Sequence, residues 1–213
     1  NMAYYYGYSK IFCKVPAWSA PLFLADGFLM EAQIPAFYQN KDAVFFLSKF
    51  LNTERAQIED KARFNSFNEL LNSMNHQNDS AKTEKLKPRI KQFEATDAEA
   101  VVKLYKEVFR SYPFPIHDAE YIRQTMMEDV QYYGVEKNGL IVAIASAEID
   151  KQGLNAEMTD FATSPEFRGK NMATYVLKKM EKQMKKQGIK NLYTIARLNS
   201  MAMNKTFLKL NYT

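Results

Sequence analysis

The sequence has few of the residues that form disulfides and metal sites. Its 213 residues include seven glycines, one cysteine (Cys13) and two distant histidines, His76 and His117. One cysteine cannot form an internal disulfide, and a single thiol suits a reducing compartment such as the cytoplasm. A structural zinc site takes four Cys or His ligands, so this composition argues strongly against one, and we expect no metal.

Long apolar runs are also absent. The longest, such as Leu140–Ala147, are far shorter than the roughly 20 residues that a membrane-spanning helix needs. The start of the sequence has no basic segment followed by an apolar stretch, so secretion is not indicated. We therefore expect a cytoplasmic protein with no membrane partner.

The charge and composition favour a globular protein with a small anionic partner. The net charge is +5, with 46% hydrophobic and 25% charged residues, which is ordinary for a globular chain. The basic residues are spread out, and no basic run is interleaved with aromatics as in nucleic-acid binders. A polyanionic cofactor explains this positive charge at least as well as nucleic acid does. We do not expect the protein to bind nucleic acid.

A polar stretch divides the chain into two regions. Residues 73–87 have few apolar side chains and are typical of a linker. Residues 1–72 are expected to form an α/β region, and residues 88–213 a second domain. The elements expected in the first region are strands over Lys10–Val15, Phe28–Phe37 and Ala43–Leu51, with helices over Ala17–Ala25 and Thr53–Glu69.

In the second region the order is β-α-α-β-β-β-α-β-α. The expected strands are Arg89–Phe93, Gln131–Glu136, Leu140–Ile149, Asn155–Thr163 and Leu192–Ala196. The helices are expected to start at a capping box, Thr96-Asp97-Ala98-Glu99, and near His117, Met172 and Ser200. The helix after the fourth strand carries an apolar stripe, which predicts a buried face. The stripe is Met172, Val176, Met180 and Met184.

The turn Thr163–Ala173 lies between that strand and that helix. A strand that turns into a helix in this way presents free backbone N–H groups at the positive helix end, which suits a phosphate or pyrophosphate. The alternative is an ordinary connection that contains two basic residues, Arg168 and Lys170.

Motif and topology together resemble a known family. The spacing Arg168-x-x-Asn171-x-Ala173 resembles the R/Q-x-x-G-x-G/A acetyl-CoA signature of the GNAT N-acetyltransferases, and the element order resembles their fold. Local strings are similar to the branch of β-lysine Nε-acetyltransferases. These strings are Lys10-Ile-Phe-Cys-Lys-Val-Pro16, Tyr112-Pro-Phe-Pro-Ile116, Asn155-Ala-Glu-Met-Thr-Asp-Phe-Ala-Thr163, Pro165-Glu-Phe-Arg-Gly-Lys170, Tyr193-Thr-Ile-Ala-Arg197, and Asn199-Ser200 with Met203-Asn204.

The resemblance implies an α/β fold with a mixed sheet and transfer of acetyl from acetyl-CoA to the side-chain amine of β-lysine. The product would be Nε-acetyl-β-lysine, a compatible solute used in osmoprotection. Two alternatives stay open for the function: the substrate is another small amine, such as lysine or a polyamine, or the protein is an acyl-CoA-binding sensor that transfers no acetyl group. A homodimer also stays open. The implied cofactor-binding residues are Phe161, Ala162, Thr163, Arg168, Gly169, Lys170, Asn171, Met172, Ala173, Thr174, Asn199 and Asn204.

Acceptor chemistry requires a base. A lysine-type amine with a pKa near 10.4 must lose a proton to become a nucleophile, which costs roughly 4.6 kcal/mol at pH 7. We expect Glu157 to be this base, with Asp160 and Glu148 as ammonium ligands or alternative bases. Strict alternation along the strand puts Glu157, Thr159, Phe161 and Thr163 on one face, and Met158, Asp160 and Ala162 on the other.

Two departures from the family pattern concern single residues. Asn171 stands where glycine is usual, and asparagine tolerates the left-handed conformation that such a turn needs. Phe207 stands where a general-acid tyrosine is usual, which puts that role in doubt. The fold is also expected to continue into further strands after Thr213.

Finally, the first region resembles a degenerate half of the second. An offset of 184 (212 − 28) aligns Phe28 with Tyr212, Phe23 with Phe207 and Gly27 with Asn211. Residues 10–51 are therefore interpreted as a GNAT half without the phosphate turn. Chance similarity of two short strand–helix units is the alternative.

Overall fold

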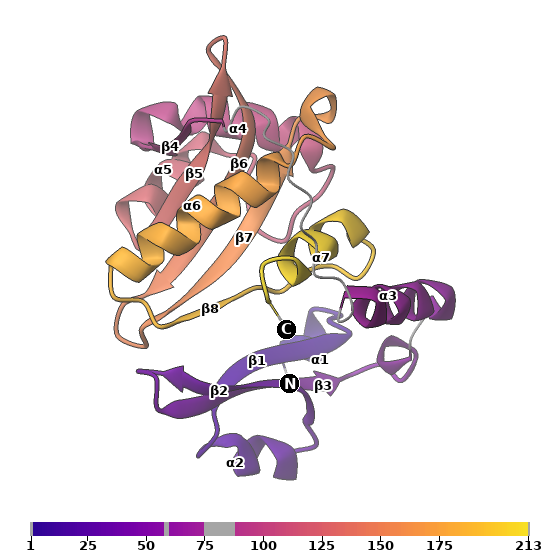
Figure 1. Cartoon of the computed structure of the whole chain (residues 1–213). Helices are drawn as coiled ribbons and strands as arrows, with labels where there is room; N and C mark the ends of the chain where they lie inside the picture. The colour runs from indigo at the N-terminus through magenta and orange to yellow at the C-terminus, as the bar shows by residue number, and fades with distance from the viewer. Residues whose placement is uncertain (1, 58–59, 75–87, 213) are drawn as a thin grey trace.

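Two β-sheets with flanking helices make up the computed structural model, which describes residues 2–57, 60–74 and 88–212. The first sheet has the strand order β1-β3-β2 and the second β4-β5-β6-β7-β8 (Figure 1). Neighbouring strands are antiparallel except β7 and β8, which are parallel. The expected mixed α/β class is confirmed.

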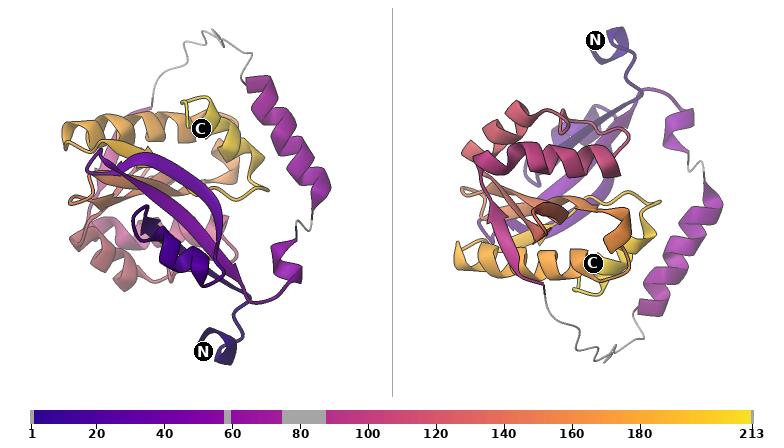
Figure 2. Two further views of the ribbon diagram at one scale, coloured as in Figure 1. Left: turned by 90° about the horizontal axis from the view of Figure 1, so that it is seen from below. Right: turned by 90° about the horizontal axis from the view of Figure 1, so that it is seen from above.

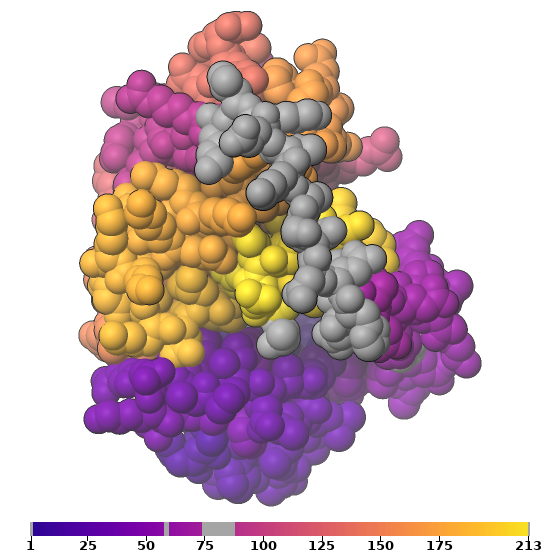
Figure 3. All heavy atoms as spheres, in the orientation of Figure 1, coloured from indigo at the N-terminus to yellow at the C-terminus, as the bar shows by residue number. Residues whose placement is uncertain are grey.

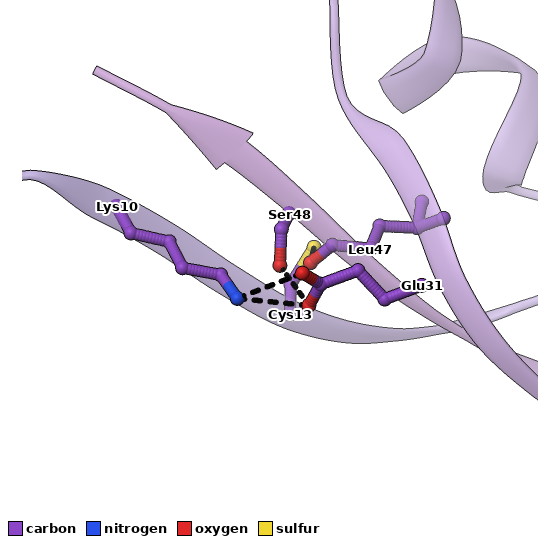
Figure 4. Close-up of polar contacts among 5 residues, drawn as sticks. All are labelled: Lys10, Cys13, Glu31, Leu47 and Ser48. Atoms are coloured by element: carbon purple, nitrogen blue, oxygen red, sulfur yellow. Dashed lines mark hydrogen bonds and ion pairs between the residues drawn. The ribbon is translucent and has the colours of Figure 1, made fainter. Parts of the chain in front are cut away.

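The first sheet is built from the early part of the chain. Its elements are α1 (Met2–Tyr5), β1 (Lys10–Pro16), α2 (Ala20–Ala25), β2 (Leu29–Tyr38) and β3 (Asp42–Phe50). Polar contacts join the three strands: Glu31 of β2 accepts hydrogen bonds from Lys10 of β1, at 2.8 Å, and from Ser48 of β3, at 2.7 Å (Figure 4). The expected strands are confirmed to within a few residues.

The helix expected over Thr53–Glu69 is wrong in its bounds. The chain instead forms a short 3₁₀ turn, η1 (Glu54–Ala56), and then a helix, α3 (Lys61–Met74). Residues 73 and 74 therefore end a helix and do not begin the linker. The rest of the predicted linker, residues 75–87, lies outside the described residues.

The second sheet carries helices on both faces. Its strands are β4 (Ile90–Phe93), β5 (Val130–Lys137), β6 (Leu140–Asp150), β7 (Asn155–Thr163) and β8 (Asn191–Tyr193). Helices α4 (Ala98–Val108) and α5 (Ala119–Met127) cover one face, and α6 (Met172–Lys186) covers the other, beside α7 (Met201–Leu208) (Figure 2). All four residues of the stripe on α6 are buried, as their spacing predicts.

One helix start differs from the prediction. The capping box before α4 is formed by Glu94 and Asp97, and the backbone N–H of Glu94 donates to Asp97 Oδ2 at 3.0 Å. It is not formed by Thr96 and Glu99, because the chain first makes a 3₁₀ turn, η2 (Ala95–Asp97). The cap therefore lies two residues earlier than expected.

The first sheet packs against β8 of the second through a shared cluster of side chains. Figure 3 shows the early part of the chain, in purple, adjoining the C-terminal part, in orange and yellow. Phe37, Val44 and Phe46 form one buried cluster with Tyr193. The side-chain amide of Asn191 donates to the carbonyl of Ala36 at 2.7 Å. Apolar packing and hydrogen bonds thus join the two regions beside the strand pair β7–β8.

Two features are absent from the part of the chain that the structure describes. None of its helices is long and apolar enough to cross a bilayer. No group of three or more His, Cys, Asp or Glu side chains in that part is placed to hold a metal ion.

Candidate active site

A β-bulge in β7 organises the candidate site. Ser146 of β6 pairs with Thr159, whereas Ile144 pairs with Ala162, so β7 has one extra residue opposite Ala145. Asp160 lies in the bulge with a φ of +54°, a conformation that non-glycine residues adopt rarely and often at functional sites.

The bulge overturns the predicted division of β7 into two faces. Phe161 packs with Met158 in the core under α6, and Ala162 packs in the core under α4 and α5. Asp160 points to the same side as Ser146, the partner of Thr159. Strict alternation fails because the extra residue reverses the order of faces after it.

Both carboxylate oxygens of Asp160 are engaged. The Tyr112 hydroxyl donates to Oδ1, and the Ser146 hydroxyl donates to Oδ2 at 2.6 Å. Burial, followed by the nearby charge of Asp160, raises the pKa of Tyr112. Tyr112 therefore stays protonated and acts as a donor that fixes this carboxylate in place.

Two further carboxylates lie opposite each other on the same sheet face. Glu148 of β6 pairs with Glu157 of β7. Partial desolvation, followed by the negative charges of Glu157 and Asp160, raises the pKa of Glu148 to about 6. Burial also raises the pKa of Glu157, against the opposing effect of the Lys14 charge. Like charges on neighbouring strands repel, so this face favours a cationic ligand.

The parallel strands β7 and β8 diverge next to this face. They pair only from Asn155 to Glu157, and β8 ends at Tyr193 and not at Ala196 as predicted, because residues 194–196 have no strand beside them in the described part of the chain. A cleft of about 120 Å³ opens there. Its lining includes Tyr112, Asp160, Phe161, Arg197 and Phe207. The carboxylate of Asp160 thus lies at a cleft between separating strands.

The turn after β7 has the conformation that the sequence predicts. Asn171 precedes α6 with φ +57° and ψ +23°, in the left-handed region. The first backbone bond at this helix end runs from the N–H of Tyr175 to the carbonyl of Asn171, at 3.2 Å. The N–H groups of Met172, Ala173 and Thr174 precede it and have no partner within the helix.

Arg168 holds the turn against the end of β7, since its Nε donates to the Thr163 carbonyl at 3.2 Å. Arg168, Gly169, Lys170 and Asn171 are all exposed. The turn therefore offers positive charge and backbone N–H donors on an open surface, which is the chemistry that binds pyrophosphate.

The predicted site residues on and before α7 differ in surroundings. The Asn204 amide donates to the carbonyls of Arg197 and Leu198, at 3.2 and 3.3 Å. Its observed role is to hold this loop, whereas Asn199 is exposed. Phe207 is buried and packs edge-on against Phe161, with ring centroids 5.3 Å apart. At that position there is no hydroxyl to act as an acid.

Sequence reasoning missed the roles of several residues that the fold brings here. Tyr112, Tyr193 and Arg197 lie within strings that resemble the family, and this resemblance is the signal by which they could have been found. Lys14 also lies within one of these strings, Lys10–Pro16, whereas Ser146 gave no such signal. Lys14 reaches the site from β1, where its Nζ donates to the Tyr193 hydroxyl at 2.6 Å.

Comparisons with known proteins identify the family of the chain. A family model described as the acetyltransferase (GNAT) family matches residues 99–212. A protein of Methanococcus maripaludis named beta-lysine N(6)-acetyltransferase is 38% identical over 213 residues, covering 96% of this chain and 73% of its own length. A protein of the same name from Methanosarcina mazei is 40% identical over 116 residues, and the match covers 54% of this chain and 43% of that protein.

Solved structures support the fold. An aminoglycoside acetyltransferase from an uncultured soil metagenomic sample has a TM-score of 0.51 at 13% identity, covering 58% of this chain and 86% of that chain. The ribosomal-protein-S18-alanine N-acetyltransferase of Escherichia coli has a TM-score of 0.50 at 17% identity, covering 58% and 76%. The chain belongs to the GNAT family of acetyltransferases.

Proposed function

We propose that the protein transfers the acetyl group of acetyl-CoA to the side-chain amine of β-lysine, giving Nε-acetyl-β-lysine. The observation that carries this proposal is the acidic sheet face formed by Glu148, Glu157 and Asp160 beside the cleft between β7 and β8. A substrate with two ammonium groups suits such a face. The relatives named for this reaction support the same substrate.

Glu157 is the residue best suited to accept the proton of the amine. A general base works best when its pKa lies near the pH at which the enzyme operates. Burial raises the pKa of Glu157 above its ordinary value, which is the direction that a base needs. Glu148 is the more exposed residue of the pair Glu148–Glu157. We assign it the role of binding the ammonium groups of the substrate. Asp160 is held by Tyr112 and Ser146, so it serves as a fixed negative charge.

The edge of β7 is suited to polarise the acetyl group. Past Glu157 no described strand pairs with the side of β7 that faces β8. Backbone N–H groups near Phe161–Thr163 can therefore donate to the thioester oxygen as it becomes negative. Acetyl-CoA is assigned to the turn Arg168–Thr174, with its pyrophosphate on the N–H groups at the start of α6.

Acetyl transfer does not require the general-acid tyrosine that the family usually has at the position of Phe207. A thiol has a pKa near 8.5, so expelling the thiolate unprotonated at pH 7 costs only about 2 kcal/mol. We infer that the product accumulates in the cytoplasm as a compatible solute. The single cysteine is in keeping with a reducing compartment.

Thiol release from acetyl-CoA tests the proposal, with β-lysine, lysine and spermidine as acceptors. We expect transfer to β-lysine, and we expect Glu157→Gln to lower kcat at pH 7 by about 10²–10⁴-fold. The rate of the variant should rise more steeply with pH, because deprotonation of the amine then depends on the solvent.

Glu120→Gln is the matched control, since Glu120 is a surface carboxylate whose side chain is 80% exposed; it should keep full activity. Acetyl-CoA binding without thiol release for any amine would instead identify an acyl-CoA sensor. Faster release with lysine or spermidine than with β-lysine would assign a different amine.

A further inference from the structure

Lys14 extends from the first sheet to the acidic face of the second. It lies on β1, and its Nζ is 2.6 Å from the hydroxyl of Tyr193 and 3.7 Å from Oε2 of Glu157. The Glu157 side chain is only 15% exposed, and that of Lys14 is 40% exposed. The ammonium group therefore approaches a largely buried carboxylate from the solvent side.

The approach of Lys14 is fixed by packing and is not a loose surface contact. The Tyr193 ring lies between the two sheets, with its centroid 5.1 Å from that of Phe37 and 6.1 Å from that of Phe46. Lys14 Nζ also lies 5.1 Å from the centroid of the Tyr193 ring. Because the first sheet is anchored on Tyr193, β1 holds Lys14 at this position.

The charges around Glu157 show why a cation matters there. Glu148 faces it from β6, and Asp160 lies further along β7; both are negative and disfavour an ionised Glu157. Tyr193 of β8 interacts directly with Glu157, and Tyr38 of β2 interacts with Tyr193. Tyr121 of α5 interacts with Glu148 and Asp160. Lys14 is the cation that acts on Glu157 in this group.

We propose that Lys14 is a positioning residue of the active site: it holds the Glu157 carboxylate beside Tyr193 and keeps it ionised, so that the first sheet is part of the catalytic unit. The inference rests on the proposed role of Glu157 as base in acetyl transfer. It gives the first region, whose role the sequence leaves unassigned, a direct part in the chemistry.

The pH dependence of kcat/KM for β-lysine tests this role. In Lys14→Met the loss of a positive charge should move the acid limb of the profile up by about one pH unit. At pH values on the acid side of the profile kcat/KM would then fall about tenfold, whereas its plateau at high pH would be unchanged. Lys14→Arg should restore the position of the limb.

Lys10→Met is the matched control. Lys10 lies on the same strand and makes an ion pair with Glu31, away from the site (Figure 4), so this variant loses the same charge without moving the limb. An equal loss of activity at every pH in Lys14→Met, with the limb in place, would overturn the proposal and indicate a structural contact alone.

A second measurement separates this inference from the proposed function. The carboxyl ¹³C resonances of glutamate can be followed against pH in the substrate-free protein, with Glu157→Gln used to assign the signal. A higher titration midpoint for Glu157 in Lys14→Met supports the inference even if no acetyl transfer is found. An unchanged midpoint overturns it even if the wild-type protein is active.

Discussion

At the scale of single residues, Asn171 combines an unusual identity with an unusual conformation. Its φ of +57° is left-handed, where a residue with a Cβ costs about 1–2 kcal/mol and asparagine costs less. We expect Asn171→Ala to raise the KM for acetyl-CoA several-fold, because the turn relaxes and its N–H groups move. Asn171→Gly should retain the wild-type KM.

Asn138→Ala is the control for this prediction. Asn138 has a similar φ of +52° in the hairpin turn between β5 and β6, away from the site. Its replacement should lower the melting temperature without changing the KM for acetyl-CoA. If both alanine variants raised the KM equally, general destabilisation would explain the effect.

Glu148 links the site to the pH dependence of stability. Its pKa in the folded protein is about 6, above the ordinary value of 4.5. Between these values the folded state binds more protons than the unfolded state, so stability falls as the pH rises through this range. The loss of stability caused by ionising Glu148 is therefore absent below pH 4.5 and fully present above pH 6.

Glu148→Gln should therefore raise the melting temperature at pH 7.5 and leave it unchanged at pH 4. Because the side chain is exposed to solvent, we expect a gain of less than about 1 kcal/mol. The same change should raise the KM for β-lysine, since the ammonium loses a partner. Thermal melts at both pH values test the prediction, and an equal gain at both would contradict it.

At the scale of elements, local sequence predicted where most strands and helices lie, but not how β7 is paired. The spacing of Met172, Val176, Met180 and Met184 fixes the buried face of α6, because a helix obeys its own periodicity. The bulge at Asp160 depends on the register of β6 against β7, and this register is a property of two strands. Alternation within one strand therefore assigned Asp160 and the residues after it to the wrong faces.

The ends of α2 and α7 agree with the predicted similarity of the two regions. The N–H of Phe28 donates to the Phe23 carbonyl, and that of Tyr212 to the Phe207 carbonyl, both at 3.1 Å. Gly27 and Asn211, which the predicted offset aligns, are both left-handed. Such caps end many helices, so descent of residues 10–51 from a GNAT half stays a prediction that superposition of the two regions would test.

At the scale of the whole molecule, the contacts that complete the site were beyond sequence reasoning. Lys14 and Tyr193 are 179 positions apart and lie on different sheets, and no local pattern specifies that β1 faces β8. The division into residues 1–72 and 88–213 stays a prediction. The packing on Tyr193 nevertheless indicates that these two parts act together.

A pair of matched substitutions tests this cooperation. Phe37, which is 2% exposed, packs on Tyr193 between the sheets. Phe28, which is 8% exposed, instead packs against Phe23 in the core between α2 and the first sheet. Replacing either by alanine should cost about 3–5 kcal/mol in the free energy of unfolding. Only Phe37→Ala loosens the anchor that places Lys14 beside Glu157.

We therefore expect Phe37→Ala to shift the acid limb of the kcat/KM profile upward, as Lys14→Met does, when measured at a temperature where both phenylalanine variants are folded. Phe28→Ala should lose stability and keep the wild-type limb. In Phe37→Ala the further replacement of Lys14 by Met should add little, because residues that act through one contact are not additive. Additive shifts would show that the sheet supports the site by a route other than Lys14.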